Sequence, residues 1–209
     1  MAHLLYIESS PRKKRSASIH VAQAFLELYG KKYPHDTVTK LDVWEEDLPP
    51  FDGDVIDAKY AIMRGESHTE AERKAWHRIE KLIQQFKSAD KYLFSIPMWN
   101  FQIPYRLKHY IDLIVQPSYT FSFSPKEGYK GLVTGKPAVL ICARGGSYPA
   151  GSPGEAVDLQ KKYMEIVLGF IGFKDLQFLM VEPTAGGGES SKLAQKAAEE
   201  KIPELLQKI

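Results

Sequence analysis

The chain has 209 residues, of which 44% are hydrophobic and 26% charged, a composition typical of one globular α/β domain. Its formal net charge of +2 predicts neither a nucleic-acid partner nor a membrane surface as a partner. The one cysteine, Cys142, excludes an intrachain disulfide and a cysteine-rich metal site, which favours a reducing cytoplasm. The sequence shows no membrane-length apolar stretch and no signal-peptide pattern. We therefore expect a single cytoplasmic domain over residues 1–209.

Hydrophobic periodicity predicts strands that alternate with helices along the whole chain. In chain order these are a strand over Leu4–Ile7, a helix from Ser16 or Ser18 to Tyr33, an edge strand over Thr37–Val43, and helices over Val55–Met63 and from Thr69 to Phe86. The second half adds a strand over Tyr92–Ile96, a helix over Tyr105–Val115, a strand over Ala138–Ala143, a helix over Val157–Phe170, a strand over Leu176–Val181 and a final amphipathic helix.

This alternation implies right-handed crossovers and a doubly wound parallel sheet. Five strands favour the flavodoxin-like order 2-1-3-4-5 in a three-layer sandwich, with a crevice where the strand order reverses. The loops Ser9–Ser18, Pro97–Ile103 and Arg144–Tyr148 follow the first, third and fourth strands. Because the carboxyl ends of parallel strands share one edge, we expect these three loops to lie together.

The first loop combines a predicted helix N-terminus with hydroxyl and basic side chains. Unpaired backbone N–H groups and the helix dipole attract anions at such a position. Ser10, Ser16 and Ser18 supply hydroxyls, and Arg12–Arg15 are all basic, so the loop suits a single phosphate. The glycine fingerprints of nucleotide triphosphatases and dinucleotide sites are absent. A solvated basic turn with ordinary serine caps is an equally good interpretation of this segment alone.

The second and third loops suit a flat heteroaromatic ring. Proline cannot donate to a ladder, so Pro97 is expected to end the central strand at Ile96. The aromatic loop behind it offers ring faces and one amide, while Gly145 and Gly146 let the backbone approach a ligand. The alternatives are a plug for the core end and a tight turn. The residues that we expect along the ring are Pro97, Met98, Trp99, Asn100, Phe101 and Arg144.

Residues 116–136 form a long aromatic excursion, which predicts either a functional loop or a small hairpin. Cys142 lies inside a predicted strand and is expected to be an inert packing residue. The histidines show no metal-ligand spacing, so we expect no metal site. A phosphate at one end and a ring slot at the other describe a mononucleotide, and on this fold FMN is the first choice.

The same residues resemble the FMN-dependent NAD(P)H azoreductase and quinone-oxidoreductase family. The resemblance runs nearly end to end through Ser9-Ser10, Ser16-Ala17-Ser18, Pro97-Met98-Trp99-Asn100-Phe101, Gly131–Lys136, Arg144-Gly145-Gly146 and Leu168–Gly172. It implies a homodimer with FMN, whose phosphate lies on the first loop. It also implies ring contacts with Ala143, Arg144, Gly145 and Gly146. The chain departs from the family pattern at Trp99, where tyrosine is common, and at Ala17, Ala143 and Phe123.

The resulting hypothesis is an FMN enzyme that passes two electrons from NADH or NADPH to a quinone or azo compound by a ping-pong mechanism. We assign no side chain as catalytic acid or base. We expect the backbone amides of Asn100 and Gly145, with Arg144, to stabilise negative charge on the reduced ring. The excursion Tyr119–Tyr129 is expected to be a lid or a contact with the partner subunit. The alternatives are a non-enzymatic flavodoxin-like carrier and a phosphate-ester hydrolase that uses the basic loop.

Overall fold

The computed structural model describes residues 1–64, 69–186 and 188–209. Its centre is a parallel sheet with the order β2-β1-β3-β6-β7. This is the predicted 2-1-3-4-5 order, because β4 and β5 form a separate two-stranded sheet. The strands of the large sheet are β1 (His3–Glu8), β2 (Thr37–Asp42), β3 (Lys91–Pro97), β6 (Ala138–Ala143) and β7 (Leu176–Val181).

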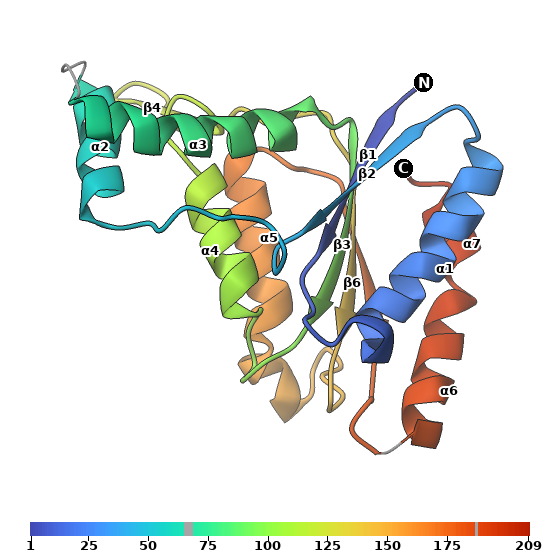
Figure 1. Cartoon of the computed structure of the whole chain (residues 1–209). Helices are drawn as coiled ribbons and strands as arrows, with labels where there is room; N and C mark the ends of the chain where they lie inside the picture. The colour runs from blue at the N-terminus through green and yellow to red at the C-terminus, as the bar shows by residue number, and fades with distance from the viewer. Residues whose placement is uncertain (65–68, 187) are drawn as a thin grey trace.

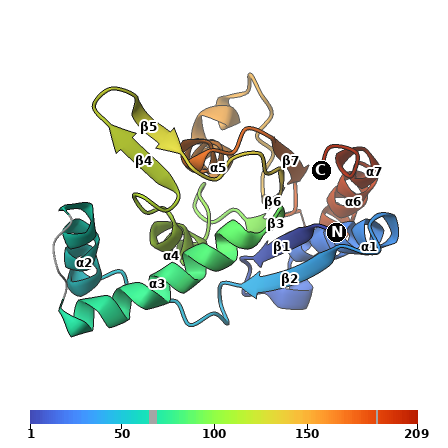
Figure 2. The same ribbon diagram turned by 90° about the horizontal axis from the view of Figure 1, so that it is seen from above.

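Helices cover both faces of the sheet, which confirms the three-layer α/β sandwich (Figures 1 and 2). One face carries α1 (Ala17–Lys32), α6 (Gly188–Glu199) and α7 (Ile202–Leu205). The other face carries α3 (Glu70–Ser88), α4 (Tyr105–Ile114) and α5 (Leu159–Ile171), and α2 (Gly53–Arg64) packs against α3. Two short 3₁₀ helices, η1 (Lys13–Arg15) and η2 (Pro153–Val157), precede α1 and α5.

The central strands are buried on both faces because each face packs against helices. Every residue of β6 is buried, and β3 is buried from Tyr92 to Ile96. Cys142 lies inside β6, where burial raises the pKa of its thiol to about 12, so the thiol is an inert packing group as expected. Among the described residues, no helix combines the length and the apolarity needed to cross a membrane.

The structure corrects three of the predictions for individual strands and helices. The β3 ladder includes Pro97, which pairs with Ala143, and the N–H of Met98 then donates to the Ala143 carbonyl (2.8 Å). The edge strand β2 does not alternate: its first four residues are exposed and only Leu41 and Asp42 are buried. The final helix is divided into α6 and α7.

The long excursion holds a hairpin, one of the two predicted alternatives, with β4 (Phe121–Ser124) and β5 (Gly128–Gly131). The hairpin base lies against the end of α5. The N–H of Val133 donates to the Ile171 carbonyl (2.8 Å), and a Cβ on Gly131 would lie 2.3 Å from the Gly172 backbone nitrogen. Only glycine at position 131 allows this approach. The hairpin extends from the amino-terminal edge of the sheet (Figure 1).

Candidate active site

The three predicted loops meet at the carboxyl edge of the sheet. The backbone N–H and the hydroxyl of Ser9 both donate to the Ser95 carbonyl (3.2 and 2.7 Å), which joins the first loop to β3. The Met98 N–H joins the second loop to the carbonyl of Ala143 at the end of β6. The N–H of Arg144 donates to the Val181 carbonyl at the end of β7 (3.0 Å). The predicted convergence of the loops is thus present, and it is built from backbone hydrogen bonds.

The serines of the first loop are buried around the start of α1. Ser10 and Ser18 are almost fully buried, and the Ser16 and Ser18 hydroxyls lie 3.1 Å apart. Ser16 occupies the N-cap position, as predicted, but its side chain makes no capping hydrogen bond. The first N–H groups of the helix, from Ala17 onward, have no partner within the helix. Hydroxyl donors and helix-end donors therefore gather at one point, as an anion site requires.

The positive charge of the first loop is partly used inside the protein. Lys13 adopts a left-handed conformation (φ 49°), and its ammonium forms ion pairs with Glu8 (3.2 Å) and Asp42. Both carboxylates are only 4% exposed, and Lys40 also pairs with them. Lys13 thus neutralises internal charge, and the interpretation of the run 12–15 as wholly available to a ligand is wrong. Arg12, Lys14 and Arg15 remain exposed.

The pKa of Asp42 reflects this pairing. Burial acts to raise it, but hydrogen bonds from the Lys13 ammonium and from the backbone N–H of Trp44 hold it below the ordinary aspartate value. The pKa of Lys13 is raised: its burial acts in the opposite direction, and the hydrogen bonds to Asp42 and Glu8 outweigh it. The charged forms of both partners are therefore the folded-state forms at neutral pH.

The second loop is a tight two-residue turn. Trp99 and Gln102 exchange backbone hydrogen bonds of 2.8 and 2.9 Å, with Asn100 and Phe101 at the tip. Both tip residues are left-handed, with φ values of 48° and 69°. A left-handed phenylalanine is uncommon and costs free energy, and such strain concentrates at functional sites. The turn exposes the backbone and side chain of Asn100, and Phe101 is 49% exposed.

The half-buried Trp99 lies in an aromatic cluster that sequence reasoning missed. Its ring centroid is 5.8 Å from that of Trp44 and 6.5 Å from that of Tyr105. Trp44 follows β2, and its Nε1–H donates to the Ser9 carbonyl (3.0 Å). The available signal was its position: a tryptophan two residues after the last residue of a strand lies at the same edge as the other loops. The loop after β2 is therefore a fourth segment at this edge.

The guanidinium of Arg144 points into the protein, contrary to the prediction that it faces a bound ring. The side chain is 1% exposed and forms ion pairs with Asp158 (2.8 Å) and Glu182 (3.4 Å). Its Nε–H donates to Gln160 Oε1 (3.1 Å), and Gln160 Nε2 donates to the Ile96 carbonyl (3.1 Å). The expected direct action of this charge on a ring is not supported, because three side-chain partners hold the guanidinium. It fixes the third loop to α5 and, through Gln160, to the end of β3.

Gly145 and Gly146 present exposed backbone beside this buried network. The Gly145 carbonyl accepts from the N–H groups of Thr184 and Ala185, each at 3.2 Å. A Cβ on Gly145 would meet the Ala185 side chain at 3.4 Å, an ordinary contact. A Cβ on Gly146 would likewise meet the Tyr148 hydroxyl at 3.4 Å, so the packing of the described residues does not demand either glycine.

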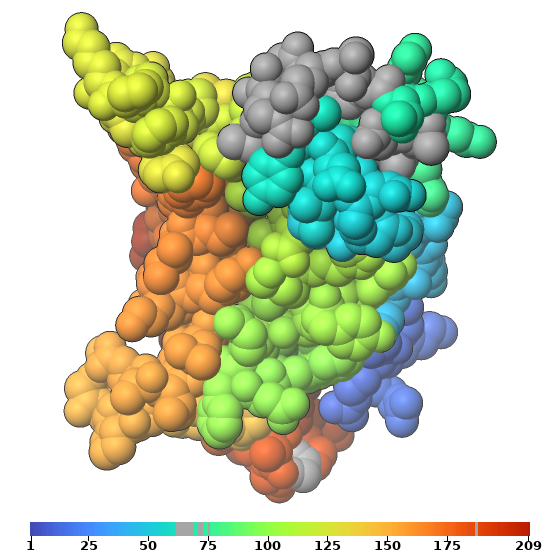
Figure 3. Space-filling model, turned by 90° about the vertical axis from the view of Figure 1, so that its left-hand side faces the viewer, coloured from blue at the N-terminus to red at the C-terminus, as the bar shows by residue number. Residues whose placement is uncertain are grey.

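The aromatic hairpin lies at the other end of the sheet from these loops (Figures 1 and 3). It therefore does not act as a lid over the site of its own chain, and Phe123 does not cover a ring there. Phe123 and Tyr129 are 60% and 66% exposed and lie 4.9 Å apart between ring centroids. Tyr129 also packs against Phe170 of α5 (5.5 Å). Contact with a second copy remains as the expectation for this surface.

A family model described as a flavodoxin-like fold matches residues 2–206. This chain belongs to that family. Of the curated relatives, "FMN-dependent NADH:quinone oxidoreductase" of Nitratidesulfovibrio vulgaris (strain DP4) is 48% identical over 94% of both chains. The protein of the same name from Desulfotalea psychrophila is 52% identical over 88% of this chain and 86% of its own.

Solved structures agree with the flavodoxin-like assignment. An azoreductase from Bacillus anthracis str. Sterne superposes with a TM-score of 0.90 at 31% identity, covering 100% of both chains. An FMN-dependent NADH-azoreductase from Bacillus anthracis str. Ames Ancestor, solved with FMN, gives a TM-score of 0.86 at 31% identity over 99% of this chain and 100% of its own. The resemblance found in the sequence motifs is thus confirmed over the full fold.

The ion pairs of Lys13 predict a pH-dependent loss of stability in Lys13→Met. Removing the cation leaves Glu8 and Asp42 as buried, underpaired charges, which lowers the free energy of unfolding at pH 7 by about 1–2 kcal/mol. This is less than for a fully buried pair, because the Lys13 side chain is 38% exposed. Urea denaturation of both proteins from pH 7 to about pH 2, which spans the ordinary and the lowered aspartate pKa, measures the difference.

The sign of the pH dependence follows from the lowered pKa of Asp42. The stability from this pairing is present above the ordinary aspartate pKa of about 3.9 and is lost as pH falls through the lowered value. The free energies of unfolding of the wild type and of Lys13→Met should therefore converge as the pH falls below this value. Lys31→Met is the control, since solvent screens the exposed Lys31–Glu27 pair and its loss should change the free energy of unfolding little at any pH. An equal cost at every pH would contradict the assignment.

Proposed function

We propose that this protein is an FMN-dependent oxidoreductase that passes two electrons from NADH or NADPH to quinones and azo compounds. The proposal rests on two independent supports: the relatives named above and the loop cluster at the carboxyl edge. The observation that carries it is that buried serine hydroxyls at a helix N-terminus lie on the same edge as a strained, exposed aromatic turn. Such a site suits a molecule with a phosphate at one end and a flat ring at the other.

The residues present fit FMN. Ser10, Ser16 and Ser18, with the backbone N–H of Ala17, supply donors for a phosphate. The Ser16 side chain is not used for helix capping, so its hydroxyl is available to a ligand. Arg12, Lys14 and Arg15 add exposed positive charge nearby. This arrangement accounts for the burial of three hydroxyl residues at one loop, which apolar packing alone does not explain.

The ring would lie between the second and third loops. Pro97, Met98, Trp99, Asn100 and Phe101 form one wall, and Ala143, the backbone of Arg144, Gly145 and Gly146 form the other edge. Asn100 and Phe101 are exposed at the left-handed tip, which supports a contact between this turn and the ring. Backbone N–H groups of Asn100 and Gly145 are the donors that we assign to negative charge on the ring.

FMN supplies the hydride and electron chemistry when it is bound, and the protein supplies orientation and electrostatics. We assign no side chain as acid or base, since the Cys142 thiol is buried and the Arg144 guanidinium is held by carboxylates. The three loops meet at one edge of the sheet and form a single candidate site. We therefore infer that the nicotinamide donor and the acceptor use this site in turn, as a ping-pong cycle requires. The oxidoreductase names of the relatives favour this enzyme over a flavodoxin-like carrier or a phosphate-ester hydrolase.

We further propose that the protein is one domain and works as a cytoplasmic homodimer. The lone, buried cysteine suits a reducing compartment. The hairpin carries Phe123 and Tyr129 in the open, and the adjoining α5 exposes Ile166 (62%) and Phe170 (37%). Contiguous exposed aromatic residues of this kind mark interaction surfaces. A second copy is the occupant that we assign, because the hairpin does not reach the site of its own chain.

The first prediction concerns the first loop, residues 9–18, which we call the phosphate loop. The purified protein reconstituted with FMN should be yellow, should bleach with anaerobic NADH and should recolour with a quinone. Ser18→Ala should weaken FMN about 10- to 100-fold, the value of a hydrogen bond to a charged group, and leave riboflavin affinity unchanged. Equilibrium titration of flavin fluorescence measures both constants. Ser88→Ala, at an exposed serine on α3, is the control. Equal weakening of both flavins would place the phosphate elsewhere, and colour without NADH bleaching would favour the carrier.

The second prediction concerns Trp99. If its indole forms part of the ring wall, Trp99→Ala should lower kcat/KM for quinone and azo acceptors about three- to tenfold, as loss of an aromatic contact implies. Trp99→Phe should retain most of the activity, because a ring still packs against Trp44 and Tyr105. Steady-state kinetics with both nicotinamides across an acceptor panel provides the test. Unchanged kinetics for every acceptor in Trp99→Ala would exclude this loop from the site.

The third prediction concerns the dimer. Phe123→Glu combined with Tyr129→Glu should convert a dimer into a monomer, since two charges would be buried without partners in the interface. Sedimentation equilibrium at micromolar concentration reports the mass. Leu193→Glu is a matched control, because Leu193 is 62% exposed on α6, on the opposite face of the sheet. A monomeric wild type, or a double variant that stays dimeric, would rule out this surface.

A further inference from the structure

One indole contacts two loops of the proposed cofactor site, those that follow β1 and β3. The Nε1–H of Trp44 donates to the carbonyl of Ser9 (3.0 Å), the residue that opens the phosphate loop. The ring of the same side chain packs against Trp99 (5.8 Å between centroids). Trp99 lies in the second loop, residues 97–103, which we call the ring loop. It also meets Tyr105 at the start of α4 in an edge-to-face contact (5.3 Å, 83°). Each loop thus rests on a different part of Trp44.

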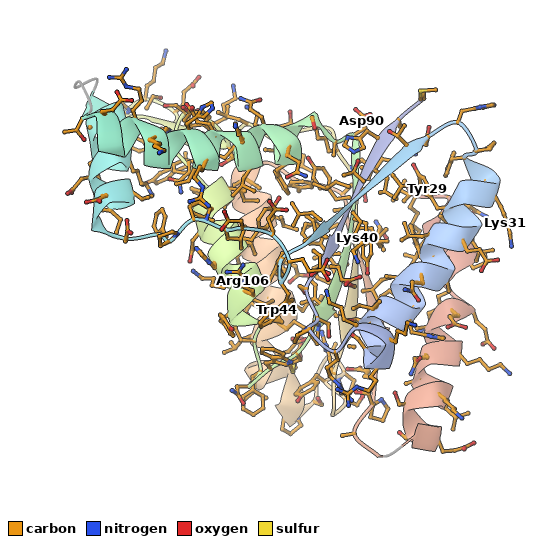
Figure 4. All side chains as sticks on the ribbon, viewed as in Figure 1. Tyr29, Lys31, Lys40, Trp44, Asp90 and Arg106 are labelled. Atoms are coloured by element: carbon orange, nitrogen blue, oxygen red, sulfur yellow. The ribbon has the colours of Figure 1, made fainter. Side chains whose placement is uncertain are left out.

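Trp44 itself is held firmly from the protein side. Its backbone N–H donates to Asp42 Oδ1 (3.1 Å). Arg106 of α4 donates from Nε to the Val43 carbonyl (2.8 Å) and from Nη2 to the Glu46 carbonyl (2.7 Å). Figure 4 shows Trp44 and Arg106 beside one another where β2 ends, with Lys40 on the strand. The backbone before and after Trp44 is therefore tied to a helix and to a strand.

The hydrogen bond to Ser9 acts on a residue with no freedom to move elsewhere. Ser9 is fully buried and already donates twice to the Ser95 carbonyl. Its own carbonyl faces the Trp44 indole, and a buried carbonyl without a donor is costly. Trp44 therefore completes the hydrogen bonding of the residue from which the phosphate loop departs.

We propose that Trp44 is a positioning residue that holds the phosphate loop and the ring loop in register, so that both ends of FMN bind without reorganisation. The proposal rests on the proposed function, since it assigns the two loops to the two ends of one ligand. Prearranged binding groups raise affinity by lowering the cost of ordering them on binding. Trp44 contributes in this way with no contact to the reacting ring required.

The two contacts of Trp44 can be removed separately. Trp44→Phe keeps an aromatic ring toward Trp99 but removes the donor to Ser9, so the phosphate loop alone loses its support. Its dissociation constant for FMN should rise about five- to tenfold, the usual effect of one buried hydrogen bond, while that for riboflavin should change less than twofold. Trp44→Leu removes both contacts and should weaken both flavins. Fluorescence titration gives all four constants.

Trp76→Phe provides a matched control. Trp76 is a buried indole on α3 whose Nε1–H donates to the Tyr119 hydroxyl (3.3 Å), outside the four loops of the site. The same atoms are removed, so a general cost of losing an indole N–H appears equally in both variants. FMN and riboflavin affinities of Trp76→Phe should match those of the wild type.

Hydrogen exchange of the flavin-free proteins provides a second readout. Trp44→Phe should speed exchange in residues 9–18 and leave residues 97–104 unchanged, whereas Trp44→Leu should speed both segments. Wild-type exchange in both variants, or unchanged FMN affinity in both, would overturn the proposal. A wild-type protein that binds no FMN would overturn the proposed function instead, and exchange would still decide whether Trp44 holds the two loops.

Discussion

The parallel pairing of β1 with β3 is the constraint on which the site depends. The last rungs of this pairing are the two hydrogen bonds that Ser9 donates to the Ser95 carbonyl. Immediately beyond them the chain leaves β1 toward α1 on one face and leaves β3 toward α4 on the other. Two loops that part at such a point leave a crevice between them, as at the switch point of any doubly wound sheet. The position of the site follows from topology before any side chain contributes.

Buried charge is the second constraint on the site. Several carboxylates lie buried at the carboxyl edge of the sheet, next to the loops. Glu8 and Asp42 lie at the ends of paired strands, and Lys13 and Lys40 pair with them. On the other side, Arg144 pairs with Asp158 and Glu182. Removing one partner of such a group costs far more than the pair contributes by itself. Lys13 and Arg144 each fix the loop in which they lie, because their charges pair with carboxylates inside the protein.

This inward use of charge explains where sequence reasoning succeeded and where it failed. The fold was predictable because periodicity marks buried strands, and the edge position of the loops follows from strand order. Lys13 and Arg144 were assigned outward roles, because a sequence shows that a cation is present but not which carboxylates the fold brings beside it. Glu8 and Asp42 are 34 positions apart and meet only through β1–β2 pairing.

The role of Trp44 and the position of the hairpin were not predictable from the sequence, for a related reason. Nothing near Trp44 in the sequence suggests Ser9 or Trp99 as neighbours, since both contacts are made across the sheet edge. The aromatic excursion was correctly predicted as a possible hairpin, but its placement at the opposite end of the sheet depends on the close approach of Gly131 to Gly172. A sequence indicates what an aromatic segment prefers, while the end of the sheet it occupies is decided by tertiary contacts.

The strained turn at Asn100–Phe101 shows how these constraints combine. A left-handed phenylalanine costs of the order of 1–3 kcal/mol, so it persists only where the surroundings over-determine it. Here the Trp99–Gln102 hydrogen-bond pair closes the turn, the Met98 N–H joins it to β6, and the aromatic contacts of Trp99 hold its side. These contacts together fix the backbone conformation of the turn. Since the contacts that we propose to the ring are largely backbone groups, the hydrogen bonds that close this turn also hold the shape that those contacts require.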